Sequence, residues 1–236
     1  MATIIHPFLN DGVEARAYQI RSLRSALTSS SLMVMPTGFG KTAVEWMIMA
    51  EYLNFGNGKI LLIAPTTGLV EQQQRMAREM IKLDDSQISR YTGETAPAKR
   101  PEIWNNAKII MATSQVIRND AQSGSIDLSE VSLLVVDEAH HATGNHAYAQ
   151  VGDLYLEAKP DAMVLAATAS PGSNERNILE VAQRLGIERL DVSRREEPLL
   201  EPYSVELENI PIRVELPDEL TTLIHPLQAH QNEEVK

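Results

Sequence analysis

The chain has no cysteine and no long apolar run, and both absences restrict its function. Without cysteine it can form no disulfide, no thiolate metal site and no thiol nucleophile. No stretch reaches the roughly 18 apolar residues that a membrane-spanning helix needs. The N-terminus also lacks the basic segment and apolar run of a signal peptide. The sequence therefore predicts a cytoplasmic protein with no membrane partner.

Positive charge is also scarce. The 236 residues include 21 Lys and Arg against 32 Asp and Glu, which gives a formal net charge of −11. Strong nonspecific nucleic-acid binders are usually basic. Backbone amides and helix N-termini can still contact phosphates without a net positive charge. We therefore expect this chain by itself to bind nucleic acid weakly and with strong salt sensitivity.

A glycine-containing loop between an apolar strand and an apolar helical stretch is the first functional motif. It consists of Met35, Pro36, Thr37, Gly38, Phe39, Gly40, Lys41 and Thr42. Glycines let backbone N–H groups turn toward a phosphate, and the helix N-terminus adds its positive dipole end. Lys41 would neutralise the β- and γ-phosphates of ATP, and the Thr42 hydroxyl would bind Mg²⁺. Met35 stands where the general pattern has glycine, so a chance turn before a core helix is the alternative for this loop alone.

A second motif follows the apolar strand Leu133–Val136, which ends in Asp137 and Glu138. In P-loop NTPases an aspartate at a strand tip holds Mg²⁺, and a neighbouring glutamate can orient or deprotonate the attacking water. The two motifs are about a hundred residues apart, but the carboxyl ends of parallel strands share one sheet edge, where ligands bind. The alternative is an ordinary strand that ends in a solvated acidic turn.

Together with Thr168-Ala169-Ser170, these motifs resemble the first motor domain of superfamily 2 helicases, in particular archaeal Hef and the Fanconi-anaemia M helicases. The shared features are an apolar residue before Pro-Thr-Gly, the run from 135 to 148, and the segment from 168 to 172. The resemblance covers roughly residues 14 to 217. It implies an α/β fold, a mostly parallel RecA-like sheet with helices on both faces, and ATP and Mg²⁺ as cofactors. Met35 fits this subgroup, which often has a bulky apolar residue there.

The resemblance assigns a role to Arg16 and Gln19, which belong to an Arg-x-Tyr-Gln segment ahead of the loop. In the family, the glutamine amide binds the adenine base, and the arginine and the aromatic residue support it. A glutamine side chain offers both a donor and an acceptor, which matches N6 and N7 of adenine. The alternative is a surface helix with an incidental glutamine.

Four residues at or near predicted strand ends resemble nucleic-acid contacts of the family: Thr66, Thr92, Gly93 and Thr113. We expect them to form a phosphate-binding track along one face. The two positions after Thr66 hold threonine and glycine, where a basic residue and a proline are usual, so one cation is missing. The alternative for Thr66 is a plain helix cap.

The family also suggests a coupling set. His140 would hydrogen-bond toward Thr168 and Ser170 and so link the ATP state to the grip on nucleic acid. The alternative is that these hydroxyls cap the following helix. Zinc binding by His140 and its histidine neighbours is disfavoured, because neighbouring side chains rarely converge on one ion and no acid or thiol lies at ligand spacing.

We expect residues 1–195 to form the N-terminal RecA-like ATP-binding domain and residues 196–236 an exit linker toward a second motor domain that is missing from the chain. In related NTPases an arginine finger raises the rate of phosphoryl transfer about 10³–10⁵-fold. The resemblance places such arginines in the second motor domain. The prediction is an ATP-binding half of a helicase or translocase for branched or forked DNA, which binds Mg·ATP but hydrolyses it slowly. Two alternatives stay open: an RNA helicase of the double-stranded-RNA type, and a nucleotide-dependent clamp without turnover.

Overall fold

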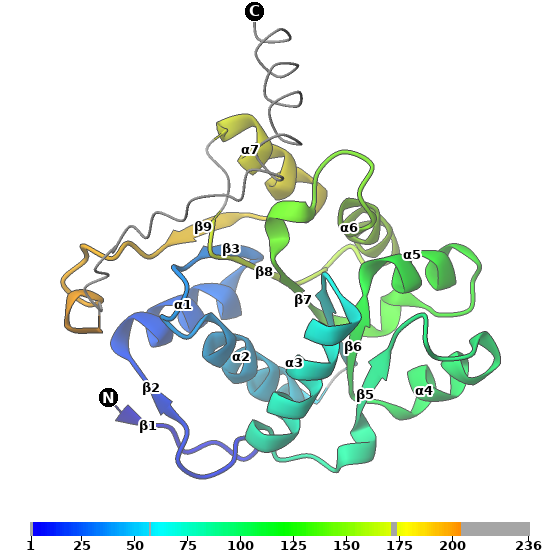
Figure 1. Cartoon of the computed structure of the whole chain (residues 1–236), viewed down its shortest axis with the longest axis horizontal. Helices are drawn as coiled ribbons and strands as arrows, with labels where there is room; N and C mark the ends of the chain where they lie inside the picture. Colours follow the sequence, from blue (N-terminus) through cyan, green and yellow to red (C-terminus); the bar gives the residue numbers. More distant parts are fainter. Residues whose placement is uncertain (1, 57, 171–173, 204–236) are drawn as a thin grey trace, which may run out of the picture. The chain divides into compact units, whose positions relative to one another are not determined.

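Seven parallel strands form the central sheet of the computed structural model, which describes residues 2–56, 58–170 and 174–203 (Figure 1). Their order is β5-β6-β4-β7-β8-β3-β9, and every neighbouring pair is parallel. The strands are β3 (Ser31–Val34), β4 (Lys59–Ala64), β5 (Ile88–Tyr91), β6 (Ile109–Thr113), β7 (Val131–Asp137), β8 (Val164–Thr168) and β9 (Arg189–Val192). A separate antiparallel pair joins β1 (Ala2–Thr3) to β2 (Glu14–Ala15).

Helices cover both faces of the sheet, and this confirms the predicted RecA-like α/β fold (Figure 1). One face carries α1 (Ala17–Thr28), α2 (Lys41–Phe55) and α3 (Thr67–Met80), and the other carries α4 (Arg100–Asn106), α5 (Ser114–Gln122), α6 (Ala147–Ala158) and α7 (Glu175–Arg184). Single 3-10 turns lie at Asp85–Gln87, Pro97–Lys99, Leu128–Glu130, Ala139–His141 and Glu201–Tyr203. No helix in these described parts of the chain has the length and apolar character to cross a membrane.

The central strands are continuous apolar runs because both of their faces are covered. Along β4, Leu61 packs into the core under α4 to α7, whereas its neighbour Leu62 packs into the core under α1 to α3. This alternation follows from the pleat of a strand, which sends successive side chains to opposite faces. Leu133–Val136 of β7 is buried completely. A short, continuous apolar run thus identified β4 and β7.

The strand order brings three motifs together at the carboxyl edge of the sheet. Strand β8 lies between β7 and β3. Asp137 ends β7, Thr168 ends β8, and the glycine-containing loop leaves β3. The backbone N–H of Met35 donates to the carbonyl of Thr168 at 3.0 Å, so the loop begins as an extension of the sheet. The motifs therefore occupy three consecutive strand ends.

The first residues of the predicted exit linker pack against the sheet-containing domain. Leu200 is fully buried in the core under α1 to α3. Glu197 accepts a hydrogen bond from the Arg21 guanidinium at 2.9 Å, which ties the segment to α1. The compact unit extends from Met1 to Ser204. The rest of the predicted linker, 204–236, lies outside the described residues.

Candidate nucleotide-binding site

Two glycines shape the loop between β3 and α2. Gly38 and Gly40 have φ angles of 88° and 78°, in the left-handed region that other residues rarely adopt. A Cβ atom on Gly40 would also collide with the side-chain amide of Gln19. Met35, in contrast, sends its side chain into the hydrophobic core and is fully buried. A bulky residue fits at position 35 because its side chain does not enter the loop.

Lys41 reaches from the start of α2 to both acidic residues at the end of β7. Its Nζ lies 3.1 Å from Oδ1 of Asp137 and 3.2 Å from Oε1 of Glu138. Burial by itself would lower the pKa of Lys41, but the charges of Asp137, Glu45 and Glu138 outweigh it and raise that pKa above its ordinary value. The loop lysine and the two carboxylates thus form one cluster.

The donor set fits Mg²⁺ bound together with a nucleotide. Thr42 lies in the first turn of α2, next to Lys41, and Asp137 lies at the end of β7. Mg²⁺ is typically bound through one or two carboxylates, substrate phosphates and waters instead of a full protein cage. One carboxylate and one hydroxyl are therefore a sufficient protein contribution when a nucleotide supplies the phosphates.

Glu138 has an unusual backbone. Among the described residues it is the one non-glycine residue with positive φ, at φ 53° and ψ 48°. Such a conformation costs on the order of 1–3 kcal/mol and tends to occur at functional sites. With this backbone, the Glu138 carboxylate lies between two partners. One of its oxygens contacts Lys41, and the other lies 3.3 Å from Nδ1 of His140.

The predicted coupling residues meet at the tip of β8. Nδ1 of His140 lies 3.1 Å from Oγ1 of Thr168. The same hydroxyl donates to the carbonyl of Ser170 at 3.0 Å and accepts from its N–H at 3.2 Å. Helix α7 is capped by the side chain of Asn174. The alternative of helix capping by Thr168 or Ser170 is therefore wrong.

The neighbouring histidines have structural roles. The rings of His141 and His146 stack with centroids 5.4 Å apart. Nδ1 of His146 accepts from the N–H of Tyr148 and so caps α6. Burial lowers the pKa of His141, and the adjacent His140 and His146 lower it further. Within the described ranges, no group of three histidine or acidic side chains is arranged to hold a metal ion.

Of the predicted adenine-binding residues, Gln19 hydrogen-bonds to the loop and Arg16 hydrogen-bonds to Gln19. Gln19 is 4% exposed, its Oε1 accepts from the Arg16 N–H at 2.9 Å, and its Nε2 donates to the Phe39 carbonyl at 3.0 Å. The Arg16 guanidinium lies 4.3 Å from the ring centroid of Tyr203. Tyr203 was missed by sequence reasoning because the prolines around it suggested a linker. Adenine binding by Gln19 stays a prediction.

The predicted nucleic-acid residues lie along the same sheet edge. Thr66 follows β4, Thr92 and Gly93 follow β5, and Thr113 ends β6, and these strands are neighbours. Thr66 caps α3, since its Oγ1 accepts from the Leu69 N–H at 3.2 Å. Thr92 and Thr113 are buried, whereas Thr66 and Gly93 are exposed. Thr66 thus fills the capping role, and nucleic-acid contact by these residues stays a prediction.

Two buried polar residues beside the cluster were missed by sequence reasoning. Glu45 lies one turn after Lys41 on α2, is fully buried, and has no hydrogen-bond partner in the described part of the chain. Burial, followed by the charge of Asp137, raises its pKa to about 8 against the opposing effect of Lys41. Gln73 of α3 donates from Nε2 to Oδ2 of Asp137 at 3.3 Å. A charge within the otherwise apolar residues 43–50 of α2 could have signalled Glu45, but nothing distinguished Gln73 from the glutamines beside it.

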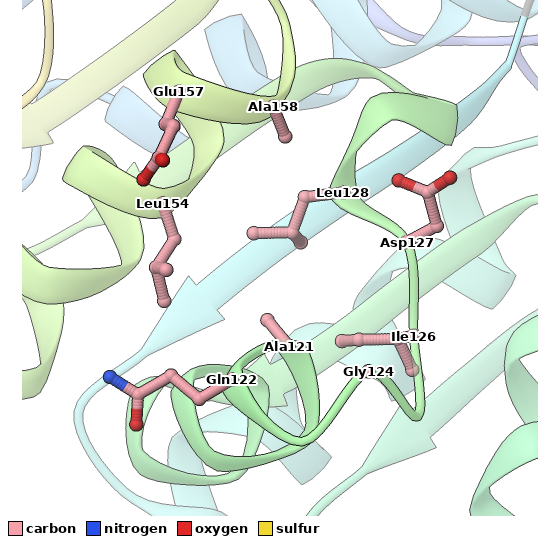
Figure 2. Close-up of a pocket in the computed structure, with 9 residues that line it drawn as sticks. All are labelled: Ala121, Gln122, Gly124, Ile126, Asp127, Leu128, Leu154, Glu157 and Ala158. Carbon is pink, nitrogen blue, oxygen red and sulfur yellow. The ribbon is translucent and has the colours of Figure 1, made fainter.

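A shallow groove of about 640 Å³ lies elsewhere, between the ends of α5 and α6 and the loop before β7 (Figure 2). Ala121, Ile126, Leu128 and Leu154 form its apolar wall, and Asp127 and Glu157 are at its border. It adjoins the start of β7, whereas Asp137 ends that strand. None of the predicted site residues lines it.

The family described as DEAD/DEAH box helicase matches residues 16–178. Three curated relatives are similar over most of the chain. They are a Methanocaldococcus jannaschii protein provisionally named an ATP-dependent RNA helicase (38% identity over 99% of the chain), the Gallus gallus Fanconi anemia group M protein (35% over 94%) and the Neurospora crassa ATP-dependent DNA helicase mph1 (34% over 83%).

A solved structure is also similar. The crystal structure of the Pyrococcus furiosus Hef helicase domain matches 86% of the chain with a TM-score of 0.78 and 39% identity. The resemblance to Hef and Fanconi-anaemia M proteins is thereby confirmed. The chain spans 30%, 11% and 17% of the lengths of the three curated relatives and 44% of the Pyrococcus chain.

Proposed function

The chain belongs to the DEAD/DEAH box helicase family, and from this premise we propose that it is the ATP-binding half of an ATP-dependent helicase or translocase. The substrate that we propose is branched or forked DNA. The observation that carries the proposal is the contact of Lys41 with both Asp137 and Glu138 across the carboxyl edge of the sheet.

The cluster supports a division of labour around Mg·ATP. The loop 35–42 binds the phosphates through its backbone amides and Lys41. Thr42 and Asp137 would hold Mg²⁺, which would neutralise charge that develops on the phosphates. The Glu138 carboxylate orients the attacking water or takes its proton. Arg16 and Gln19 bind the adenine end.

Slow hydrolysis by this chain is part of the proposal. Phosphoryl transfer in P-loop enzymes relies on an arginine finger worth about 10³–10⁵ in rate. We assign this arginine to a second motor domain outside these 236 residues. The short share of each relative that the chain spans supports this assignment. The bound nucleotide would then lie between the two domains.

The edge formed by Thr66, Thr92, Gly93 and Thr113 is the proposed path of one nucleic-acid strand. Its nearness to the nucleotide cluster, on the same edge of the same sheet, supports this path. His140 and Thr168, joined at 3.1 Å, are the proposed link between the two sites. DNA is favoured by the Neurospora relative, which is named a DNA helicase, and RNA by the Methanocaldococcus relative, which is named an RNA helicase.

The first test is Mg·ATP turnover by the chain, with no nucleic acid, with forked DNA and with double-stranded RNA. Lys41→Ala supplies the blank. We expect the chain to bind ATP clearly and to hydrolyse it slowly. At low salt it should bind forked DNA more tightly than double-stranded RNA. Rapid DNA-stimulated turnover by the chain alone would contradict the assignment of the arginine to another domain. ATP binding without turnover in a longer protein that contains both motor domains would favour the clamp.

A further inference from the structure

We propose that Gln73 is a positioning residue that orients the carboxylate of Asp137 for Mg²⁺. The inference rests on the proposed function, because it assigns Asp137 to the metal. None of the motifs described above includes Gln73, which lies on α3 and reaches the strand-end carboxylate from the side. Its contact with Asp137 joins the metal-binding strand to the helix that begins at the predicted nucleic-acid edge.

The Asp137 carboxylate is held on both oxygens. Oδ1 lies 3.1 Å from the Lys41 ammonium and accepts from the N–H of Glu138 at 3.0 Å. Oδ2 accepts a hydrogen bond from Nε2 of Gln73 at 3.3 Å. Within the described chain, Gln73 is the side chain that donates to this oxygen. With a donor on each oxygen, rotation of the carboxylate about χ2 is restricted. A fixed orientation matters because the affinity of a metal site depends on the partners that hold its ligands.

The chemistry of the contact identifies which end of the amide faces Asp137. An ionised carboxylate only accepts hydrogen bonds, so the NH₂ group of Gln73 must point toward it. Gln73 and Asp137 are 7% and 6% exposed, and a hydrogen bond shielded from water is electrostatically stronger than an exposed one. The contact is therefore polar, directed and shielded.

Plain packing does not account for a glutamine at this position. The face of α3 that meets the sheet carries Val70, Gln73 and Ala77. The Oε1 atom of Gln73 is buried without a hydrogen-bond partner in the described part of the chain. A buried unpaired acceptor is unfavourable, and methionine would fill a similar volume without it. The contact with Asp137 is the feature that a glutamine supplies and an apolar residue does not.

The test separates metal binding from nucleotide binding in the 236-residue chain. A fluorescent ADP analogue is titrated in EDTA, and Mg²⁺ is then titrated at a fixed nucleotide concentration. We expect Gln73→Met to weaken the apparent Mg²⁺ affinity about tenfold, in the range found for residues that hold metal ligands. The ADP affinity in EDTA should stay within twofold of the parent. Gln73→His, which keeps a ring N–H donor, should recover most of the Mg²⁺ affinity.

Gln72→Met is the matched control, since the same substitution is made one residue earlier on an exposed face of α3. It should leave both affinities unchanged. An unchanged Mg²⁺ affinity in Gln73→Met would refute the inference, and so would a parallel loss of Mg²⁺ and ADP binding, which indicates a structural role. Lys41→Ala separates this result from failure of the proposed function. If Lys41→Ala still binds ADP normally, the phosphate-loop assignment is wrong, whatever Gln73 does.

Discussion

Nζ of Lys41 lies 3.1 Å from Oδ1 of Asp137, and this contact joins the start of α2 to the end of β7. It passes over the end of β8, which separates β7 from β3, the strand that precedes α2. Both side chains are largely shielded from solvent, with exposures of 15% and 9%. The lysine is therefore a shielded positive charge in contact with two acidic groups, Asp137 and Glu138. Its removal should disturb the electrostatic balance of the cluster and the phosphate binding that we propose for it.

Replacement of Lys41 by alanine should abolish nucleotide binding. The ammonium is the group assigned to the β- and γ-phosphates, and without it Asp137 and Glu138 repel them. Lys59→Ala is the control, since Lys59 starts β4 and pairs with Glu130 at 3.5 Å. Fluorescence titration with an ADP analogue measures both variants. Unchanged affinity in Lys41→Ala would remove the basis for the phosphate-loop assignment.

Replacement of Glu138 by glutamine should leave ATP binding intact and stop hydrolysis. The amide keeps the size of the carboxyl group but cannot accept the proton of the attacking water. Turnover is measured in a protein with both motor domains, and binding in either form. Glu130→Gln, in the 3-10 turn before β7, provides a glutamate control away from the site. Loss of binding in Glu138→Gln would show that Glu138 shares the role assigned to Asp137.

Replacement of Glu45 by glutamine should stabilise the chain relative to the parent, and the difference in the free energy of unfolding should grow as pH rises. The pKa of Glu45 is raised from 4.5 to about 8 in the folded chain, so between these values the folded state holds a proton that the unfolded state releases. The free energy of unfolding therefore falls with increasing pH across this window, by about 1.4 kcal/mol per pH unit, and levels off above it. Glutamine does not ionise, so this contribution disappears.

Urea unfolding in EDTA between pH 5 and 8.5 measures the Glu45 effect. The difference between Glu45→Gln and the parent should be small near pH 5 and reach about 3 kcal/mol near pH 7. Glu51→Gln, later on α2 and only partly buried, is the matched control. A difference independent of pH would mean that Glu45 is ionised throughout, and the inferred proton would be wrong.

Replacement of Gly40 by alanine should destabilise the chain and disturb the loop. The left-handed backbone is unfavourable for alanine, and the new Cβ would also displace the Gln19 amide. Gly124→Ala is the control, because Gly124 has a φ of 72° but open space around its Cβ position. Thermal unfolding should show a loss of about 1 kcal/mol for the control and a larger loss for Gly40→Ala. Equal losses would show that the contact with Gln19 adds nothing.

The sequence predicted the sheet well because parallel strands covered on both faces are continuous apolar runs. Lys59–Ala64 and Leu133–Val136 were assigned as strands on that pattern, and both lie in the centre of the sheet. The loop glycines were also predictable, since a left-handed turn needs them. Both features depend on residues that are adjacent in the sequence and not on distant partners.

Contacts between distant segments could not be predicted in the same way. Gln73 stands in a run of three glutamines, and only the packing of α3 beside β7 selects one of them for Asp137. Tyr203 lies among prolines, yet it stacks on Arg16. Helix capping explained Thr66 correctly but failed for Thr168, because the hydroxyl of Thr168 faces His140 of another segment.

The sequence by itself determined which elements form, which loop can surround a phosphate and which acidic pair lies at a strand end. The elements follow from the spacing of apolar residues, the loop from the backbone freedom of glycine, and the acidic pair from side-chain chemistry. All three are local properties of the sequence. Only the tertiary structure decided that β8 separates the two ATP motifs and that Lys41, Asp137 and Glu138 meet. It also buried Glu45 beside them. Strand order and burial depend on how all the segments pack together, and no local pattern encodes that.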